Sequence, residues 1–74
     1  MGRLRVLSGR EVCRILEGQG FSDVRRRGSH VVMQRRTDTG TITVPIPDHS
    51  TLAVGTLRSI IRQCGLARKL FEAK

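Results

Sequence analysis

A histidine directly follows the densest run of positive charge in the chain, because three arginines at positions 25–27 lead into Gly28-Ser29-His30. An imidazole exchanges a proton near neutral pH, since its ordinary pKa is about 6.5, and arginine pairs bidentately with phosphate. Cleaving RNA without a metal needs a base that takes the proton of a ribose 2′-hydroxyl, and cations that offset the charge growing on the phosphate. His30 is therefore the candidate general acid or base. The candidates for holding the phosphate are Arg25, Arg26, Arg27 and Arg35.

The residues of this motif also have ordinary structural roles. A lone histidine at the start of a strand is more often a turn or packing residue than a catalyst. Gly28 and Ser29 either place the ribose or only form a turn, since glycine readily adopts the positive φ that a tight hairpin requires. The motif alone therefore leaves both interpretations open.

His49, Arg58 and Arg62 are secondary candidates. His49 is either a second acid–base group or a loop residue held by its neighbour Asp48. Arg58 and Arg62 stand one helical turn apart, and they either contact phosphate or belong to a solvated helix face.

The composition favours an anionic partner. The 74 residues carry a net charge of +8, and 12 of the 14 basic residues are arginine. The lack of Trp and Tyr favours contacts with backbone phosphates over stacking on bases. A solubilising surface with no specific partner is the alternative. A chain of this length forms one small domain, over residues 1–74, with a thin core and no deep substrate cavity, which excludes multidomain and membrane-spanning proteins.

The cysteines and the N-terminus give no sign of a metal, a cofactor or a membrane anchor. Cys13 and Cys64 lie far apart, without a Cys-x-x-Cys pair or a histidine at ligand spacing. Both fall on apolar helical stripes, so we expect buried, reduced thiols. The N-terminus lacks the apolar run of a signal peptide, and a cytoplasmic protein is the default expectation.

Local patterns predict the elements that position these residues. Ser8 and Glu11 have the spacing of a capping box and open an amphipathic helix over 8–19, which Gly20 ends. A hairpin follows, with strands at 24–27 and 30–35 around the turn Gly28-Ser29. The alternating segment 41–46 is a third strand, which Pro45 places at an edge or a bend.

The second long helix is predicted over 53–64, because Leu57, Ile60, Ile61 and Cys64 recur at helical spacing before Gly65. Residues 66–71 are expected to form a short last helix whose Leu70 and Phe71 cover the open end of the core. The predicted fold is α+β in the order α-β-β-β-α, a three-stranded antiparallel sheet with both helices on one face and the other face open.

Three motifs in this order resemble the HicA (YcfA-like) toxin family. They are Gly-Ser-His at 28–30 after a basic strand, Thr-Val-Pro at 43–45, and Gly-Thr-Leu-Arg-Ser-Ile at 55–60 with Gln-Cys-Gly-Leu at 63–66. The resemblance spans nearly the whole chain. It implies a fold similar to a double-stranded RNA-binding domain, activity as a ribosome-independent mRNA interferase that arrests growth, and neutralisation by a HicB-type antitoxin. The catalytic histidine of the family follows its Gly-Ser pair and corresponds to His30.

One segment departs from the family. Many relatives pass from Val-Pro almost directly to a second histidine, whereas Ile46-Pro47-Asp48 precedes His49 here. The equivalence of His49 with that histidine therefore stays open.

Two other classes of function fit the same charge. A non-catalytic double-stranded RNA-binding module would read RNA shape through phosphate and 2′-hydroxyl contacts and would not need His30. A basic DNA-binding or antitoxin-like module is a third class, but no helix-turn-helix with a short glycine turn joins the two long helices.

Overall fold

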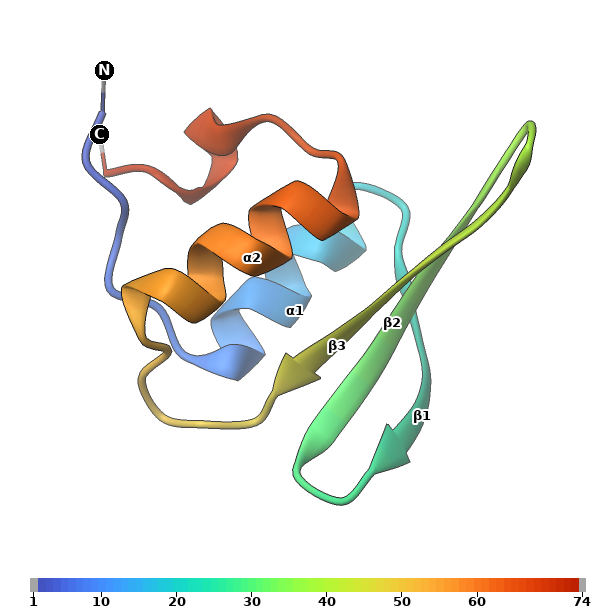
Figure 1. Ribbon diagram of the computed structural model, residues 1–74, viewed down its shortest axis with the longest axis horizontal. Coiled ribbons are helices and arrows are strands. Elements are labelled where there is room, and N and C mark those ends of the chain that lie inside the picture. Colours follow the sequence, from blue (N-terminus) through green and yellow to red (C-terminus); the bar gives the residue numbers. More distant parts are fainter. Residues whose placement is uncertain (1, 74) are drawn as a thin grey trace.

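The computed structural model describes residues 2–73 and has the predicted α-β-β-β-α order. Its elements are α1 (Gly9–Gly18), β1 (Ser22–Arg27), β2 (His30–Thr37), β3 (Gly40–Pro47), α2 (Val54–Cys64) and a short 3-10 helix η1 (Arg68–Phe71). The two long helices lie beside each other in one layer against the sheet, and the β2–β3 hairpin projects past them (Figure 1). This small α+β fold is consistent with that of double-stranded RNA-binding domains.

The ends of α1 are set by the residues that predicted them. The hydroxyl of Ser8 accepts a hydrogen bond from the Glu11 amide, and the Glu11 carboxylate accepts one from the Ser8 amide, which completes a capping box. At the other end, Gly20 has a φ of +92° and donates its N–H to Glu17, while the Phe21 N–H reaches the carbonyl of Leu16. This pair of bonds is a Schellman motif, and it turns Phe21 back into the core.

The sheet is antiparallel in the order β1-β2-β3, so β1 and β3 are its two edges. Gly28 has a φ of +58° and Ser29 a negative φ, as in the type II′ turns that join adjacent strands. The sheet register pairs His30 with Arg27 on one side and with Pro47 on the other. Pro45 lies on the edge strand β3, as predicted, where a missing N–H does not interrupt a central ladder.

The core lies between the helices and one face of the sheet. Its fully buried side chains come from all layers and are Leu7, Val12, Leu16, Met33, Val44, Ile46, Leu57, Ile60, Cys64 and Phe71. Phe71 confirms that η1 covers the open end of the core, whereas Leu70 is half-buried. Both thiols are free as predicted, but Cys13 is only half-buried because it lies at the margin of the helix stripe.

The two ends of the chain lie next to each other (Figure 1). Leu4 and Glu72 form an antiparallel bridge, and Arg5 donates its N–H to the carbonyl of Phe71. Within residues 2–73, no helix has the length and apolar content needed to cross a membrane.

Candidate nucleic-acid interface

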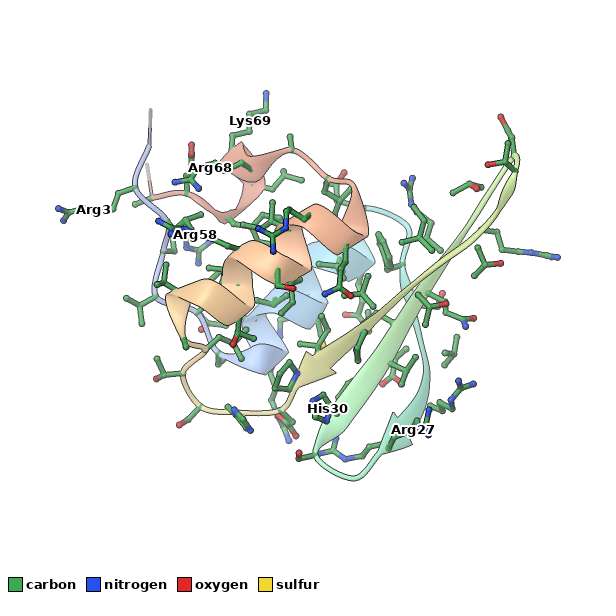
Figure 2. The ribbon with its side chains drawn as sticks, in the orientation of Figure 1. Arg3, Arg27, His30, Arg58, Arg68 and Lys69 are labelled. Carbon is green, nitrogen blue, oxygen red and sulfur yellow. The ribbon has the colours of Figure 1, made fainter. Side chains whose placement is uncertain are left out.

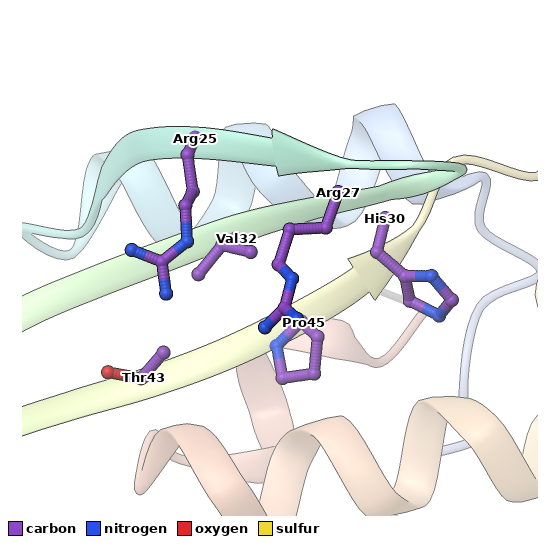
Figure 3. A pocket seen from close by; sticks show the side chains of 6 residues that line it. All are labelled: Arg25, Arg27, His30, Val32, Thr43 and Pro45. Carbon is purple, nitrogen blue, oxygen red and sulfur yellow. The ribbon is translucent and has the colours of Figure 1, made fainter.

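The open face of the sheet, away from the helices, holds His30. Successive side chains of a strand alternate between the two faces, so His30 shares this face with Val32 of the same strand. A shallow hollow of about 350 Å³ lies there and is lined by Arg25, Arg27, His30, Val32, Thr43 and Pro45. We call it the open-face hollow. Figure 3 shows the side chains of Arg25, Arg27 and His30 projecting on this one side of the sheet.

Arginine stems form the walls of the open-face hollow, and an apolar residue forms its floor. Val32 is only 4% exposed although it faces away from the helices. The side chains of Arg25 and Arg27 extend from β1 across β2 on either side of it (Figure 3), and Pro45 borders it from β3. Arg25, Arg27 and His30 themselves are exposed. The hollow therefore combines an accessible imidazole, two guanidinium groups and an apolar floor.

The sheet register pairs His30 directly with Arg27, one of the two arginines of the hollow. They are cross-strand partners on either side of the two-residue turn, so their Cβ atoms stand roughly 5 Å apart. A phosphate bound by the guanidinium of Arg27 would lie within reach of the imidazole. No ion pair joins Arg25, Arg27 or His30 to a carboxylate of residues 2–73, so both guanidinium groups keep their charge available for an anion.

The structure does not bring Arg26 and Arg35 to the open-face hollow. Arg26 alternates to the opposite face of β1, where its Nη2 donates to the Asp48 carboxylate at 2.5 Å. Arg35 lies near the other end of β2, with its guanidinium 5.5 Å from the centroid of the Phe21 ring. Its Nε is buried and has no hydrogen-bond partner among residues 2–73. Of the four arginines predicted for phosphate, two line the open-face hollow and two do not.

Asp48 is held by arginines rather than by His49. Its carboxylate receives Arg26 and lies 3.7 Å from Nε of Arg10. The hydrogen bond from Arg26 is the main cause that lowers the pKa of Asp48 from its ordinary value. Within residues 2–73 the side chain of His49 has no hydrogen bond to Asp48, and it does not line the open-face hollow.

Arg58 and Arg62 are exposed on α2 and do not line the open-face hollow. Figure 2 shows Arg58 near the chain termini, with Arg3, Arg68 and Lys69, while Arg27 and His30 lie at the opposite end of the molecule. Of the two roles considered for Arg58 and Arg62, their exposed positions on α2, away from the hollow, agree with a solvated helix face.

Gly28 and Ser29 form the turn that joins Arg27 to His30. A Cβ at Gly28 would meet nothing within 4 Å, so its φ of +58° and not the space around it favours glycine. The carbonyl of Ser29 accepts a hydrogen bond of 2.7 Å from the Asp48 amide. The turn is therefore tied to the loop that follows β3.

Reasoning from the sequence missed Val32, Thr43 and Pro45 as residues of the hollow. The period of two was present in both strands, and the Gly28-Ser29 turn sets the register of β1 against β2. These two signals together place Val32 on the face of His30. Thr43 and Pro45 follow from the alternation of β3, whose Val44 and Ile46 are buried on the other face.

No group of three His, Cys, Asp or Glu side chains in residues 2–73 comes together as a metal site would require. A protein-family model described as the HicA toxin of bacterial toxin–antitoxin systems matches residues 9–66, well over half of the chain. Comparison of this chain with curated proteins and with solved structures found no match.

Proposed function

We propose, from the premise that this chain belongs to the HicA toxin family of bacterial toxin–antitoxin systems, that it is an mRNA interferase: an endoribonuclease that needs neither the ribosome nor a metal ion. The observation that carries the proposal is the position of His30, exposed on the open face of the sheet beside Arg25 and Arg27. An open hollow admits a long polymer, which a deep cavity would exclude. Cleavage of mRNA by the free toxin would arrest translation and growth.

The reaction uses His30 as the general base. Neutral imidazole takes the proton of a ribose 2′-hydroxyl, and the 2′-oxygen forms a bond to the adjacent phosphorus as the bond from phosphorus to the 5′-oxygen breaks. The leaving 5′-oxygen takes a proton from water, and His30 returns its own proton to solvent. The products are a 2′,3′-cyclic phosphate and a 5′-hydroxyl, so atoms and charge balance without an external reactant.

Arg25 and Arg27 stabilise the phosphate as its negative charge grows. A donor placed at such a position contributes on the order of 3 kcal/mol to transition-state stabilisation. Their guanidinium groups reach the hollow from β1, and the apolar floor at Val32 lowers the local dielectric beneath them. Affinity then comes mainly from phosphate contacts, which agrees with a chain that has no Trp or Tyr.

The partner of a toxin of this family is an antitoxin. We propose a HicB-type antitoxin that covers the open face of the sheet and blocks RNA by occlusion. Acidic residues on that partner would steer it toward the exposed arginines, so association should slow as salt is raised. Complex formation insensitive to salt argues against the electrostatic part of this proposal.

The proposal is tested by mapping the ends of the RNA that the purified protein cleaves in the presence of EDTA. Mass spectrometry is expected to find 2′,3′-cyclic phosphates and 5′-hydroxyls, and a 5′-phosphate would overturn the mechanism. His30→Ala should abolish cleavage and growth arrest while retaining the fold and RNA binding. His49→Ala is the matched control, because His49 does not line the open-face hollow. If neither protein cleaves RNA, and His30→Ala still binds RNA and arrests growth like wild type, the non-catalytic RNA-binding module is favoured instead.

A further inference from the structure

The tip of the β1–β2 hairpin, defined as residues 27–30, has little support from the hairpin itself. All six residues of the edge strand β1 are exposed, and so are Gly28 and Ser29. β2 is supported by β3 as far as the pair His30 and Pro47, but β1 has only one neighbouring strand, and exposed loop tips open locally at low cost. Arg27 and His30 stand on this tip, so their relative position depends on contacts from elsewhere in the fold.

The loop that follows β3 supplies those contacts through Asp48. The Asp48 amide donates to the carbonyl of Ser29 at 2.7 Å, and the Asp48 carboxylate accepts from Nη2 of Arg26 at 2.5 Å. One residue therefore holds both the turn and the strand that precedes it. The Asp48 side chain is only 16% exposed, compared with 56% for Arg26, so the partly buried end of this ion pair is the aspartate.

The same loop is anchored to the core on its other side. The Gly9 amide at the start of α1 donates to the carbonyl of His49 at 2.9 Å. Gly9 is buried so closely against the loop that a Cβ there would lie 2.0 Å from the carbonyl oxygen of Pro47. The Leu52 amide then donates to Leu7, a residue of the core. Asp48 thus connects the exposed tip of the hairpin to the buried core of the molecule.

The ion pair with Asp48 engages only the middle one of the three consecutive arginines, Arg26. Arg26 is engaged on the helix side of β1, where Arg10 adds a second cation 3.7 Å from the same carboxylate. Arg25 and Arg27 project together into the open-face hollow, because successive side chains of β1 alternate between the two faces. A twist of β1 that broke the Arg26 contact would move both of them relative to His30.

We infer that Asp48 is a positioning residue, which fixes Arg27 and His30 in the arrangement that cleavage requires. This inference rests on the proposed function and adds to it a residue that touches neither the open-face hollow nor the RNA bound in it. Misplacing reacting groups by about 1 Å can cost about 100-fold in rate. The role of Asp48 is therefore expressed in the rate of the chemical step and not in RNA affinity.

The first test compares Asp48→Ala with Asp38→Ala in steady-state cleavage of a short RNA oligonucleotide. Asp38 is exposed in the β2–β3 turn, forms no ion pair within residues 2–73, and its removal makes the same change in net charge. We expect Asp48→Ala to lower kcat at least about 10-fold with KM nearly unchanged, and Asp38→Ala to leave kcat at the wild-type value. A raised KM with unchanged kcat would overturn the positioning role.

The second test asks whether Asp48 acts through Arg26. Arg26→Met keeps the aliphatic stem and removes the charge, with Arg36→Met as the matched control at the far end of β2. The double variant Arg26→Met/Asp48→Ala should lose no more than the worse of the two single variants, because the singles break the same link. Additive losses would show two independent effects and overturn the inference.

Asp48→Asn covers the case in which the alanine variant fails to fold, since it keeps the side-chain size and the backbone bond to Ser29. Amide hydrogen exchange should then be faster at residues 27–30 and unchanged in α1, and unchanged exchange at the tip counts against the inference. His30→Ala in the same cleavage assay separates the two hypotheses. If His30→Ala is inactive and both Asp48 variants cleave like wild type, only the positioning role fails. If His30→Ala cleaves like wild type, the catalytic role of His30 fails, and the proposed mechanism fails with it.

Discussion

Arg27 and His30 are the last residue of β1 and the first residue of β2, and the sheet register pairs them directly. Their side chains project on the side of the sheet that the helices leave uncovered (Figure 3). A two-residue turn keeps the two residues adjacent in the sheet. Because the Asp48 amide donates to the carbonyl of Ser29 in that turn, the hairpin tip and the loop after β3 together place a base beside a phosphate ligand.

Replacing Arg27 should reduce cleavage far more than replacing an arginine elsewhere. Arg27→Met is expected to lower kcat about 100-fold, as the loss of one well-placed donor to transition-state charge does. Arg36→Met removes the same charge from an exposed position at the far end of β2 and should change kcat less than about 2-fold. The kcat of each variant is measured by steady-state cleavage of a short RNA oligonucleotide. Equal losses in the two variants would mean that net charge, and not placement, decides the rate.

The salt dependence of RNA binding should show whether the two arginines of the hollow, Arg25 and Arg27, contact RNA phosphates. For single-stranded RNA, the logarithm of the affinity falls with the logarithm of the salt concentration, by about 0.7 for each phosphate neutralised. In the His30→Ala background, which prevents cleavage, Arg25→Met/Arg27→Met should flatten this slope by about 1.4. Fluorescence anisotropy over a range of NaCl concentrations measures it. An unchanged slope would show that RNA binds at another surface.

Local signals in the sequence were sufficient to predict the two helices and the Gly28-Ser29 turn. The Ser8–Glu11 capping box, the Gly20 stop and the positive φ at Gly28 each depend on residues within a few positions of one another. Such interactions act on any chain that contains them, and the predicted element bounds agree with the structure to within about two residues. The placement of His30 on the open face also follows, because alternation and the turn determine it.

The contacts of Arg26 and Arg35 could not be predicted from local signals in the sequence. Arg26 meets Asp48, which is 22 positions away along the chain, and Arg35 lies over the ring of Phe21. Both contacts arise only when the sheet and α1 pack together. A run of consecutive arginines looks like one cluster in sequence, but a strand divides it between two faces.

Acid should destabilise the fold in part through Glu11. Hydrogen bonds from the Ser8 amide and hydroxyl lower the pKa of Glu11 below its ordinary value of 4.5. A carboxylate with a depressed folded pKa stabilises the protein above its unfolded pKa, and that contribution is lost as pH falls through the folded pKa. Wild type should therefore be more stable than Glu11→Gln at pH 7, and the difference should shrink below about pH 4.5. Urea unfolding at several pH values measures this, and a difference independent of pH would contradict it.

The Cys13 thiol should react slowly although it is half exposed. Burial is the main cause that raises its pKa to about 11, and the carboxylates of Asp23 and Glu17 add to the shift. Because the thiolate is the nucleophile, alkylation of the folded protein by iodoacetamide should be slow at pH 8 and should still increase at pH 10. In guanidinium chloride the rate should level off near the ordinary thiol pKa of about 8.5. The same pH profile in both states would show that the fold does not protect Cys13.

Phe71 lies beyond the segment that the family model matches, yet its side chain is completely buried. It belongs to the same core cluster as Leu7, while the Arg5 amide donates to its carbonyl and fixes the N-terminal segment beside it. Phe71→Ala should therefore lower the free energy of unfolding by about 3–5 kcal/mol, the usual cost of emptying an aromatic site. Since a domain of this size has little stability to spare, the variant should be largely unfolded at 37 °C and inactive for that reason. Lys69→Ala, which removes an exposed side chain from the same 3-10 helix, should unfold at the wild-type temperature in a circular dichroism melt. A Phe71→Ala protein that melts with wild type would mean that the core is stable without the Phe71 side chain, and that η1 is dispensable.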